Sequence, residues 1–162
     1  SHVYIPQQFE NNSNPNMHYI STGPEILQDL PDVDVFVAGV GTGGTVSGVA
    51  KYLKEKKTVY SVAVEPVDSA VISGHEPGPH MIQGIGAGFK PNVLNLDLLD
   101  RILPVSDENA FLFAQRLGKE EGITAGSSSG AACFAANEMA KELGPKKNVV
   151  VVLPCRRALY ES

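Results

Sequence analysis

The sequence has no tryptophan, only two cysteines and no long apolar run among its 162 residues. No segment is apolar enough over its length to cross a bilayer as a helix, and the first residues have neither the basic start nor the apolar core of a signal peptide. We therefore expect a cytoplasmic protein with no membrane partner. Cys133 and Cys155 lack metal-ligand spacing, so the sequence predicts free thiols and no metal site.

Positive charge is also in short supply. Thirteen Lys and Arg residues stand against 18 Asp and Glu residues, which gives a formal net charge of −5 at pH 7, and the cationic residues are scattered along the chain. A nucleic-acid-binding surface normally needs a basic patch or stripe, so no nucleic acid is expected as a partner. An anionic small molecule would have to be held by a local arrangement of donors.

The sequence does contain a regular alternation of apolar, β-branched runs with amphipathic segments. Runs without polar alternation are typical of strands that are buried on both faces of a parallel sheet, and the segments between them have helical periodicity. Strands are predicted over residues 33–40, 58–66, 101–105 and 148–154, and helices over 44–57, 106–122 and 127–144. This order predicts a single α/β domain over residues 1–162, with a mostly parallel sheet flanked by helices.

Local signals predict where several helices begin and end. Ser106 is expected to cap one helix that Gly122 ends, and Ser127 is expected to cap the next. Near the N-terminus, the sequence predicts a short strand, an Asn-rich turn and a helix over about 18–30 that is interrupted at Gly23–Pro24.

The turn after the first predicted strand reads GVGTGGT, residues 39–45. At the positive end of a helix, such a loop presents free backbone N–H groups and threonine hydroxyls, which together bind phosphate. Two alternatives stay open on this local evidence. The glycines also suit a tight turn without a ligand. Alternatively, Gly39, Gly41 and Gly44, with Glu65 about twenty residues further on, match a dinucleotide-binding Rossmann fingerprint.

Segments far apart in the chain carry a family resemblance. GVGTGGT, SVAVEP, GPHMIQGIGAGF and AGSSSGAA occur in this order, after the opening PQQFENNSNPNMHYISTGPEI. Together they resemble the cysteine synthase (O-acetylserine sulfhydrylase) family of pyridoxal-phosphate enzymes, which are tryptophan synthase β-like. The resemblance runs from about Tyr4 to Pro154 and implies an incomplete domain, the C-terminal, phosphate-binding half of the enzyme. It implies that the pyridoxal 5′-phosphate site is formed by Gly41, Thr42, Gly43, Gly44, Thr45, Gly84, Ile85 and Gly86, with Gln83 beside them.

The resemblance also implies a reaction. In the complete enzyme, β-replacement converts O-acetylserine and sulfide to cysteine and acetate. The family's Schiff-base lysine and the loop that holds the substrate carboxylate have no counterpart in this sequence. We therefore expect the chain to hold only the cofactor phosphate, to supply no catalytic residue and to be inactive alone. A non-catalytic interaction module on the same fold is the alternative.

The last residues, PCRRALYES, depart from the family pattern. Arg156 stands where the family has a serine that contacts the pyridine nitrogen, so we expect this tail not to perform the family role. Ser127 or Ser128 is a candidate for a supporting contact near the site. Because the resemblance covers one of two domains that close over the cofactor, a strand edge and an apolar face should be uncovered. We therefore expect a homo-oligomer.

Overall fold

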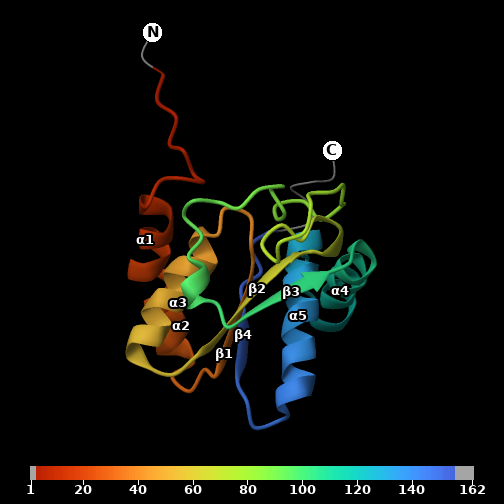
Figure 1. The fold of residues 1–162 in the computed structure, drawn as a ribbon. Helices are drawn as coiled ribbons and strands as arrows, with labels where there is room; N and C mark the ends of the chain where they lie inside the picture. The colour runs from red at the N-terminus through yellow and green to blue at the C-terminus, as the bar shows by residue number, and fades with distance from the viewer. Residues whose placement is uncertain (1–2, 156–162) are drawn as a thin grey trace.

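A parallel sheet of four strands forms the centre of the structure, a computed structural model in which residues 3–155 are described (Figure 1). The strands lie in the order β3-β2-β1-β4, and every neighbouring pair is parallel. Their bounds are β1 (Val35–Gly39), β2 (Tyr60–Pro66), β3 (Arg101–Val105) and β4 (Val149–Val151). The predicted α/β class with a mostly parallel sheet is confirmed.

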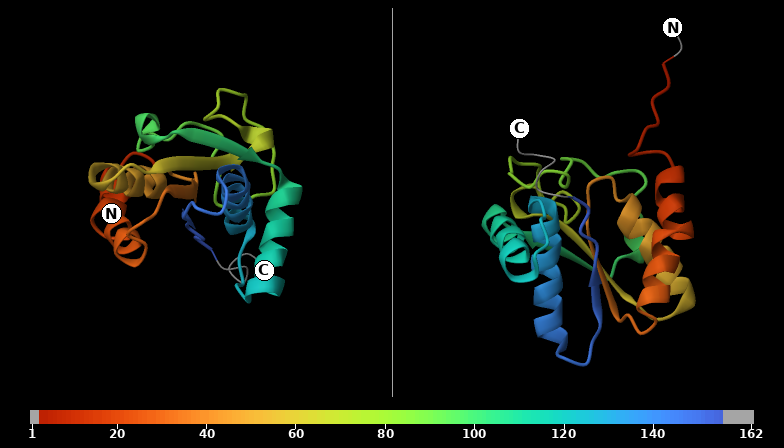
Figure 2. Two further views of the ribbon diagram at one scale, coloured as in Figure 1. Left: turned by 90° about the horizontal axis from the view of Figure 1, so that it is seen from below. Right: turned by 180° about the vertical axis from the view of Figure 1, so that it is seen from behind.

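Helices cover both faces of this sheet (Figure 2). On one face α3 packs on the strands and on α1 and α2; on the other, α5 packs on the strands and on α4. The helices are α1 (Ser13–Ile20), α2 (Thr22–Asp29), α3 (Gly44–Lys56), α4 (Asp107–Glu121) and α5 (Ser127–Leu143), with short 3-10 helices η1 (Val67–Ser69) and η2 (Leu96–Leu98).

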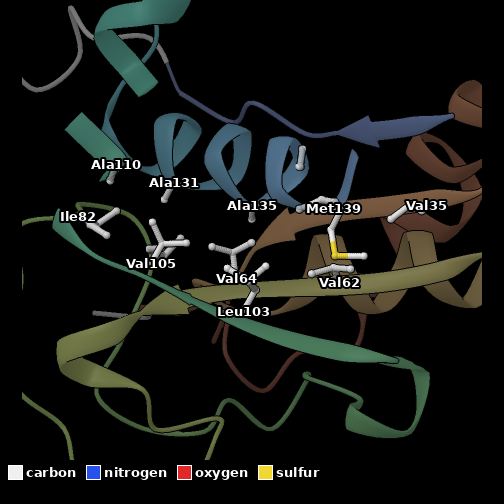
Figure 3. Close-up of a cluster of buried hydrophobic side chains, with 13 residues drawn as sticks. Val35, Val62, Val64, Ile82, Leu103, Val105, Ala110, Ala131, Ala135 and Met139 are labelled. Atoms are coloured by element: carbon white, nitrogen blue, oxygen red, sulfur yellow. The ribbon is translucent and has the colours of Figure 1, made fainter. Parts of the chain in front are cut away.

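The central strand β1 is buried on both faces because its side chains alternate between two hydrophobic cores. Val35 and Val37 belong to the core under α5, which Figure 3 shows, whereas Phe36 and Ala38 belong to the core under α3. Full burial of a valine or phenylalanine side chain contributes about 1.5–3 kcal/mol. This two-sided burial explains why the sequence of β1 has no polar alternation.

Both predicted ends of α4 are confirmed. The predicted N-cap of α5 is wrong by one residue. The Ser106 hydroxyl accepts the N–H of Asn109 at 3.3 Å, and Gly122 ends the helix in the left-handed conformation at φ 69°. The N-cap of α5 is Gly126, and Ser127 is already helical. The Ser127 hydroxyl is not used as a cap because it accepts a backbone N–H from another loop, described below.

The N-terminal prediction is also corrected. The Asn-rich segment forms α1 instead of a turn, and residues 3–12 contain no strand. The predicted interruption lies at Ser21, between two separate helices. Pro24 does not break α2 because it lies in the first turn, where the missing N–H of proline has no helical partner to lose.

The last strand is shorter and less buried than predicted. Residues 148–154 were expected to form a strand covered on both sides, but β4 spans only Val149–Val151 and is half-buried, because it is an edge strand of the described sheet. Its outer side has no neighbour within residues 3–155.

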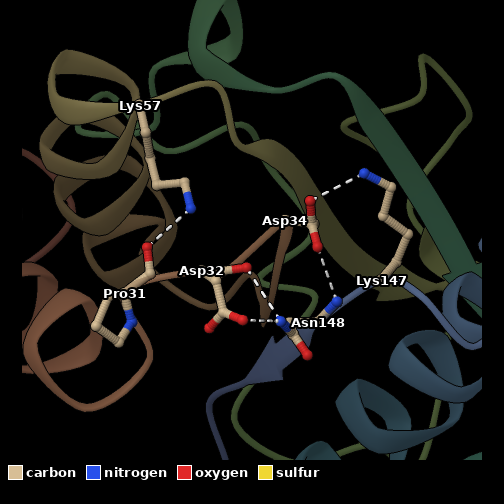
Figure 4. A network of polar contacts seen from close by, with 6 residues as sticks. All are labelled: Pro31, Asp32, Asp34, Lys57, Lys147 and Asn148. Atoms are coloured by element: carbon tan, nitrogen blue, oxygen red, sulfur yellow. Dashed lines mark hydrogen bonds and ion pairs between the residues drawn. The ribbon is translucent and has the colours of Figure 1, made fainter.

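Polar contacts fix the start of β4 against the start of β1 (Figure 4). The Asn148 backbone N–H donates to Asp34 Oδ2 at 2.9 Å, and Lys147 Nζ lies 3.0 Å from Asp34 Oδ1. The Asn148 side chain donates to the Asp32 carboxylate at 2.7 Å. The Asn148 N–H and the Lys147 ammonium hold the pKa of Asp34 below its ordinary value. The register of β4 against β1 is therefore set by the two polar residues that precede it, Lys147 and Asn148, as well as by its valines.

Candidate functional site

The GVGTGGT loop joins the carboxyl end of β1 to the N-terminus of α3. Gly43 is the N-cap, in the left-handed conformation at φ 83°, and α3 begins at Gly44. The first N–H groups of a helix have no intrahelical acceptor. Here the Gly44 N–H donates to Thr42 Oγ1 at 3.2 Å, and those of Thr45 and Val46 follow it at the positive end of α3. The loop thus places backbone donors at the edge of the sheet where parallel α/β proteins bind ligands.

The second predicted segment, Gly84–Gly86, packs directly on this loop. The Gly86 N–H donates to the Val40 carbonyl at 3.1 Å. A Cβ atom on Gly41 would lie 2.4 Å from the Gly84 carbonyl oxygen, so only glycine permits this approach. The structure therefore brings together the two segments that the sequence analysis named as candidates, although 38 or more residues separate them in the chain.

His80 holds the Gly84–Gly86 segment from the side. The Ile82 N–H donates to His80 Nδ1 at 3.2 Å, so the ring proton sits on Nε2, which donates to the Gly86 carbonyl at 3.0 Å. The Ser127 hydroxyl accepts the Gln83 N–H at 3.3 Å. Of the two candidates Ser127 and Ser128, Ser127 thus supports this segment, whereas the Ser128 hydroxyl lies beside the Cys155 sulfur.

Two side chains of α1 contact the threonines of the GVGTGGT loop, and sequence reasoning missed both. Asn14 Nδ2 donates to Thr42 Oγ1 at 2.9 Å, and His18 Nε2 lies 3.2 Å from Thr45 Oγ1. The other ring nitrogen of His18 lies 2.9 Å from the Thr22 hydroxyl. Partial burial lowers the pKa of His18, which favours the neutral ring.

A sequence signal for this contact does exist. Gly44 and Gly48 are four residues apart and therefore share one face of α3. A Cβ atom on Gly48 would lie 2.1 Å from the Pro15 carbonyl oxygen, and one on Gly44 would overlap the Asn14 side-chain amide. A pair of glycines with this spacing indicates that another backbone crosses the helix closely, and here that backbone is α1.

Glu65 does not serve as the ribose-binding carboxylate that the Rossmann alternative needs. Its side chain is 1% exposed and accepts the N–H groups of Ile72 at 2.8 Å and Ser73 at 3.0 Å, as well as the Ser73 hydroxyl. The carboxylate therefore shapes the turn that follows η1, and its oxygens are already engaged within the protein.

The N-terminus of α5 lies beside Cys155. Ser128 Oγ is 2.9 Å from the Cys155 sulfur and Ser129 Oγ is 3.4 Å from it, while the Gly126 N–H donates to the Cys155 carbonyl. Burial raises the pKa of the Cys155 thiol, but these hydrogen bonds together outweigh burial and leave its pKa below the ordinary value. The next residue, Arg156, lies outside the described residues, so its predicted departure from the family role stays a prediction.

The donors of this site fit the phosphate of a cofactor. Glycines allow the two segments to approach, and the loop lies at a helix N-terminus, where the N–H groups that have no intrahelical acceptor favour an anion. In the described part of the chain, no group of three His, Cys, Asp or Glu side chains is placed to hold a metal ion. Within the same residues, no helix has the length and apolar character needed to span a membrane.

The fold and this loop define an α/β protein with a glycine-rich loop at the carboxyl end of its central strand. Residues 1–154 match the family model described as "Pyridoxal-phosphate dependent enzyme", and the chain belongs to that family. The resemblance to cysteine synthases is confirmed by sequence relatives. The chain is 54% identical to cysteine synthase of Staphylococcus aureus and 52% identical to cysteine synthase A of Escherichia coli, over 99% and 96% of its own length.

Solved structures agree with the sequence relatives. O-acetyl serine sulfhydrylase isoform 3 from Entamoeba histolytica has a TM-score of 0.93 and 42% identity, and covers 98% of this chain. The O-acetylserine dependent cystathionine beta-synthase from Helicobacter pylori has a TM-score of 0.92 and 42% identity, with the same coverage. The match covers 48% and 52% of those chains. Likewise, the chain spans about half the length of the curated relatives it matches.

Proposed function

We propose that this chain supplies the cofactor-phosphate site of a cysteine synthase-like enzyme that depends on pyridoxal 5′-phosphate. The complete enzyme would convert O-acetylserine and sulfide to cysteine and acetate by β-replacement. In this proposal residues 1–162 form a single domain, equivalent to the C-terminal half of such an enzyme. The observation that carries the proposal is the packing of Gly84–Gly86 on the donor loop at the N-terminus of α3.

Each part of the site has a role in this proposal. The loop Gly41–Thr45 binds the phosphate through its hydroxyls and the N–H groups that have no partner in the loop, and the helix dipole of α3 favours its negative charge. The backbone of Gly84–Gly86, which packs on this loop, contacts the bound group from one side. When bound, pyridoxal phosphate supplies an electron sink for chemistry at the substrate α-carbon. This chain positions that group and contributes no catalytic residue.

The proposal is tested by calorimetric titration of the chain with pyridoxal phosphate, pyridoxal and NAD. Pyridoxal phosphate should bind about tenfold or more tightly than pyridoxal, because only the former engages the loop with a charged group. Thr42→Val should remove most of this preference, whereas Thr58→Val, at an exposed position after α3, should leave it unchanged. Borohydride reduction should trap no stoichiometric lysine adduct. Equal affinity for the two pyridoxal compounds, or tighter binding of NAD, would refute the proposal.

A further inference from the structure

The Thr42 hydroxyl is committed to donating a hydrogen bond. A hydroxyl oxygen has two acceptor positions and one proton. Thr42 Oγ1 accepts from Asn14 Nδ2 at 2.9 Å and from the Gly44 N–H at 3.2 Å. With both acceptor positions filled, the one remaining interaction of this hydroxyl is the donation of its own proton. Such a group can bind an acceptor, such as a phosphate oxygen, but not a donor.

Asn14 is held so that it can impose this polarity. Its Nδ2 also donates to the Gln8 carbonyl at 2.8 Å, and its own backbone N–H donates to the Asn11 carbonyl at 3.0 Å. Two acceptors, the Gln8 carbonyl and Thr42 Oγ1, therefore fix the orientation of the amide with nitrogen toward the loop. The amide oxygen lies against Gly44, where no Cβ atom fits. The amide cannot turn over without bringing its oxygen against the Gln8 carbonyl.

We propose that Asn14 is a positioning residue that sets the polarity of the phosphate site. By filling an acceptor position of Thr42, it makes the site favour the fully ionised form of a phosphate monoester, whose oxygens are all acceptors. This inference rests on the proposed function, because it assigns a ligand polarity to the same site. Asn14 acts through Thr42.

The test exchanges the amide for a carboxylate of the same shape. In Asn14→Asp the new oxygen accepts the Thr42 proton, so the hydroxyl no longer donates to the ligand. The matched control is Asn16→Asp, which adds the same charge to an exposed position of the same helix. Affinity for pyridoxal phosphate is measured by calorimetry for both variants, each alone and combined with Thr42→Val. Thermal unfolding of every variant checks that the fold is retained.

Asn14→Asp should weaken pyridoxal phosphate binding by roughly 10- to 100-fold, the range for a lost hydrogen bond to a charged group. Asn16→Asp should weaken it less than about threefold. In the Thr42→Val background the excess effect of Asn14→Asp over Asn16→Asp should shrink, because the hydroxyl through which Asn14 acts is gone. In ³¹P NMR, Asn14→Asp should raise the apparent pKa of the bound phosphate above that in the Asn16→Asp variant, because Thr42 Oγ1 can then accept a hydrogen bond from the protonated phosphate.

Equal effects of the two carboxylates on the wild-type background would overturn the inference, as would an Asn14→Asp effect that persists undiminished in the Thr42→Val background. Both outcomes leave the proposed function standing if the wild-type chain still prefers pyridoxal phosphate to pyridoxal. Loss of that preference in the wild-type chain instead refutes the proposed function, and the inference with it.

Discussion

The two cysteines differ in environment although both are half-buried. Cys133 lies in α5, and burial raises the pKa of its thiol. At Cys155 burial acts in the same direction, but hydrogen bonds from Ser128 and Ser129 lower the pKa of the thiol below its ordinary value. The thiolate is the reactive form of cysteine. The two thiols should therefore react at different rates.

We predict that iodoacetamide alkylates Cys155 several-fold faster than Cys133 at pH 8, as measured by time-resolved peptide mass spectrometry. Ser128→Ala should narrow the difference, because it removes a hydrogen bond that favours the thiolate. In denaturant the two rates should converge. For folding, the lowered pKa means that Cys155 stabilises the native chain above the ordinary thiol pKa of 9.0 and that this contribution is lost as pH falls through the lowered value. Equal native rates would contradict the prediction.

Among residues, the glycines of the GVGTGGT loop could be named from sequence as backbone donors, because this property depends only on the local strand–turn–helix arrangement. A Gly-rich turn between a strand and a helix presents N–H donors whatever surrounds it. Asn14 and His18 could not be predicted in the same way, because their importance depends on α1 crossing α3, which is a tertiary contact. Glu65 was ambiguous for the same reason: its partners, Ile72 and Ser73, come from an irregular turn without a periodic signal.

At the scale of elements, the contact of α1 with α3 depends on a glycine in the middle of a helix. Gly48 is a poor helix former, yet a Cβ atom there would lie 2.1 Å from the Pro15 carbonyl oxygen, which belongs to backbone. Gly118 in α4 offers a contrast, because the nearest atom to its Cβ would be 3.9 Å away. The two helical glycines therefore predict opposite effects of substitution by alanine.

Gly48→Ala should lower the free energy of unfolding by about 1–3 kcal/mol, because the new methyl group forces α1 away from α3. Gly118→Ala should raise it by about 0.5–1 kcal/mol, since alanine is the better helix former and no atom opposes it. Both values come from urea denaturation followed by circular dichroism. Gly48→Ala should also weaken pyridoxal phosphate binding, because Asn14 and His18 move with α1. A Gly48→Ala variant as stable as wild type would show that α1 and α3 can accommodate a methyl group between Gly48 and the Pro15 carbonyl, and would contradict the prediction.

The strands and long helices were predictable because periodicity and two-sided burial leave a direct trace in the sequence. The errors fall where that trace is weak. Pro24 was read as an interruption, but proline is harmless in the first turn of α2. The burial of β4 was overestimated because four consecutive valines, residues 149–152, followed by Leu153, are typical of a central strand. Position in the sheet depends on which strands follow or precede, and the local pattern does not contain that information.

At the scale of the whole molecule, β4 has no neighbouring strand on its outer side among the residues that the structure describes. The Asn148 carbonyl accepts the Val35 N–H, and the Val152 N–H donates to the Val37 carbonyl. In a parallel ladder alternate residues face opposite neighbours, so the peptide groups of Val149 and Val151 face outward. Unpaired strand edges of this kind promote association with another chain.

We predict that the chain forms a homo-oligomer through this edge. Multi-angle light scattering should give a mass that rises above the monomer value of 17.2 kDa as concentration increases. Val151→Pro should shift the mass toward the monomer, because it removes an outward N–H, whereas Val151→Thr, which keeps the β-branched shape and the N–H, should not. A constant mass of 17.2 kDa across the concentration range would rule out this association.

The pairing of β4 with β1 also has a consequence for how the chain folds during synthesis. Asp34 and Asn148, which fix the two strands together, are 114 residues apart. Closing so long a loop is slow compared with forming local contacts. As the chain leaves the ribosome, β2 can join one side of β1 early, whereas β4, its partner on the other side in the described sheet, emerges only with residues 149–151. Between the emergence of β2 and that of β4, the side of β1 that β4 covers lacks its native partner, and the nascent chain is then exposed to non-native strand pairing.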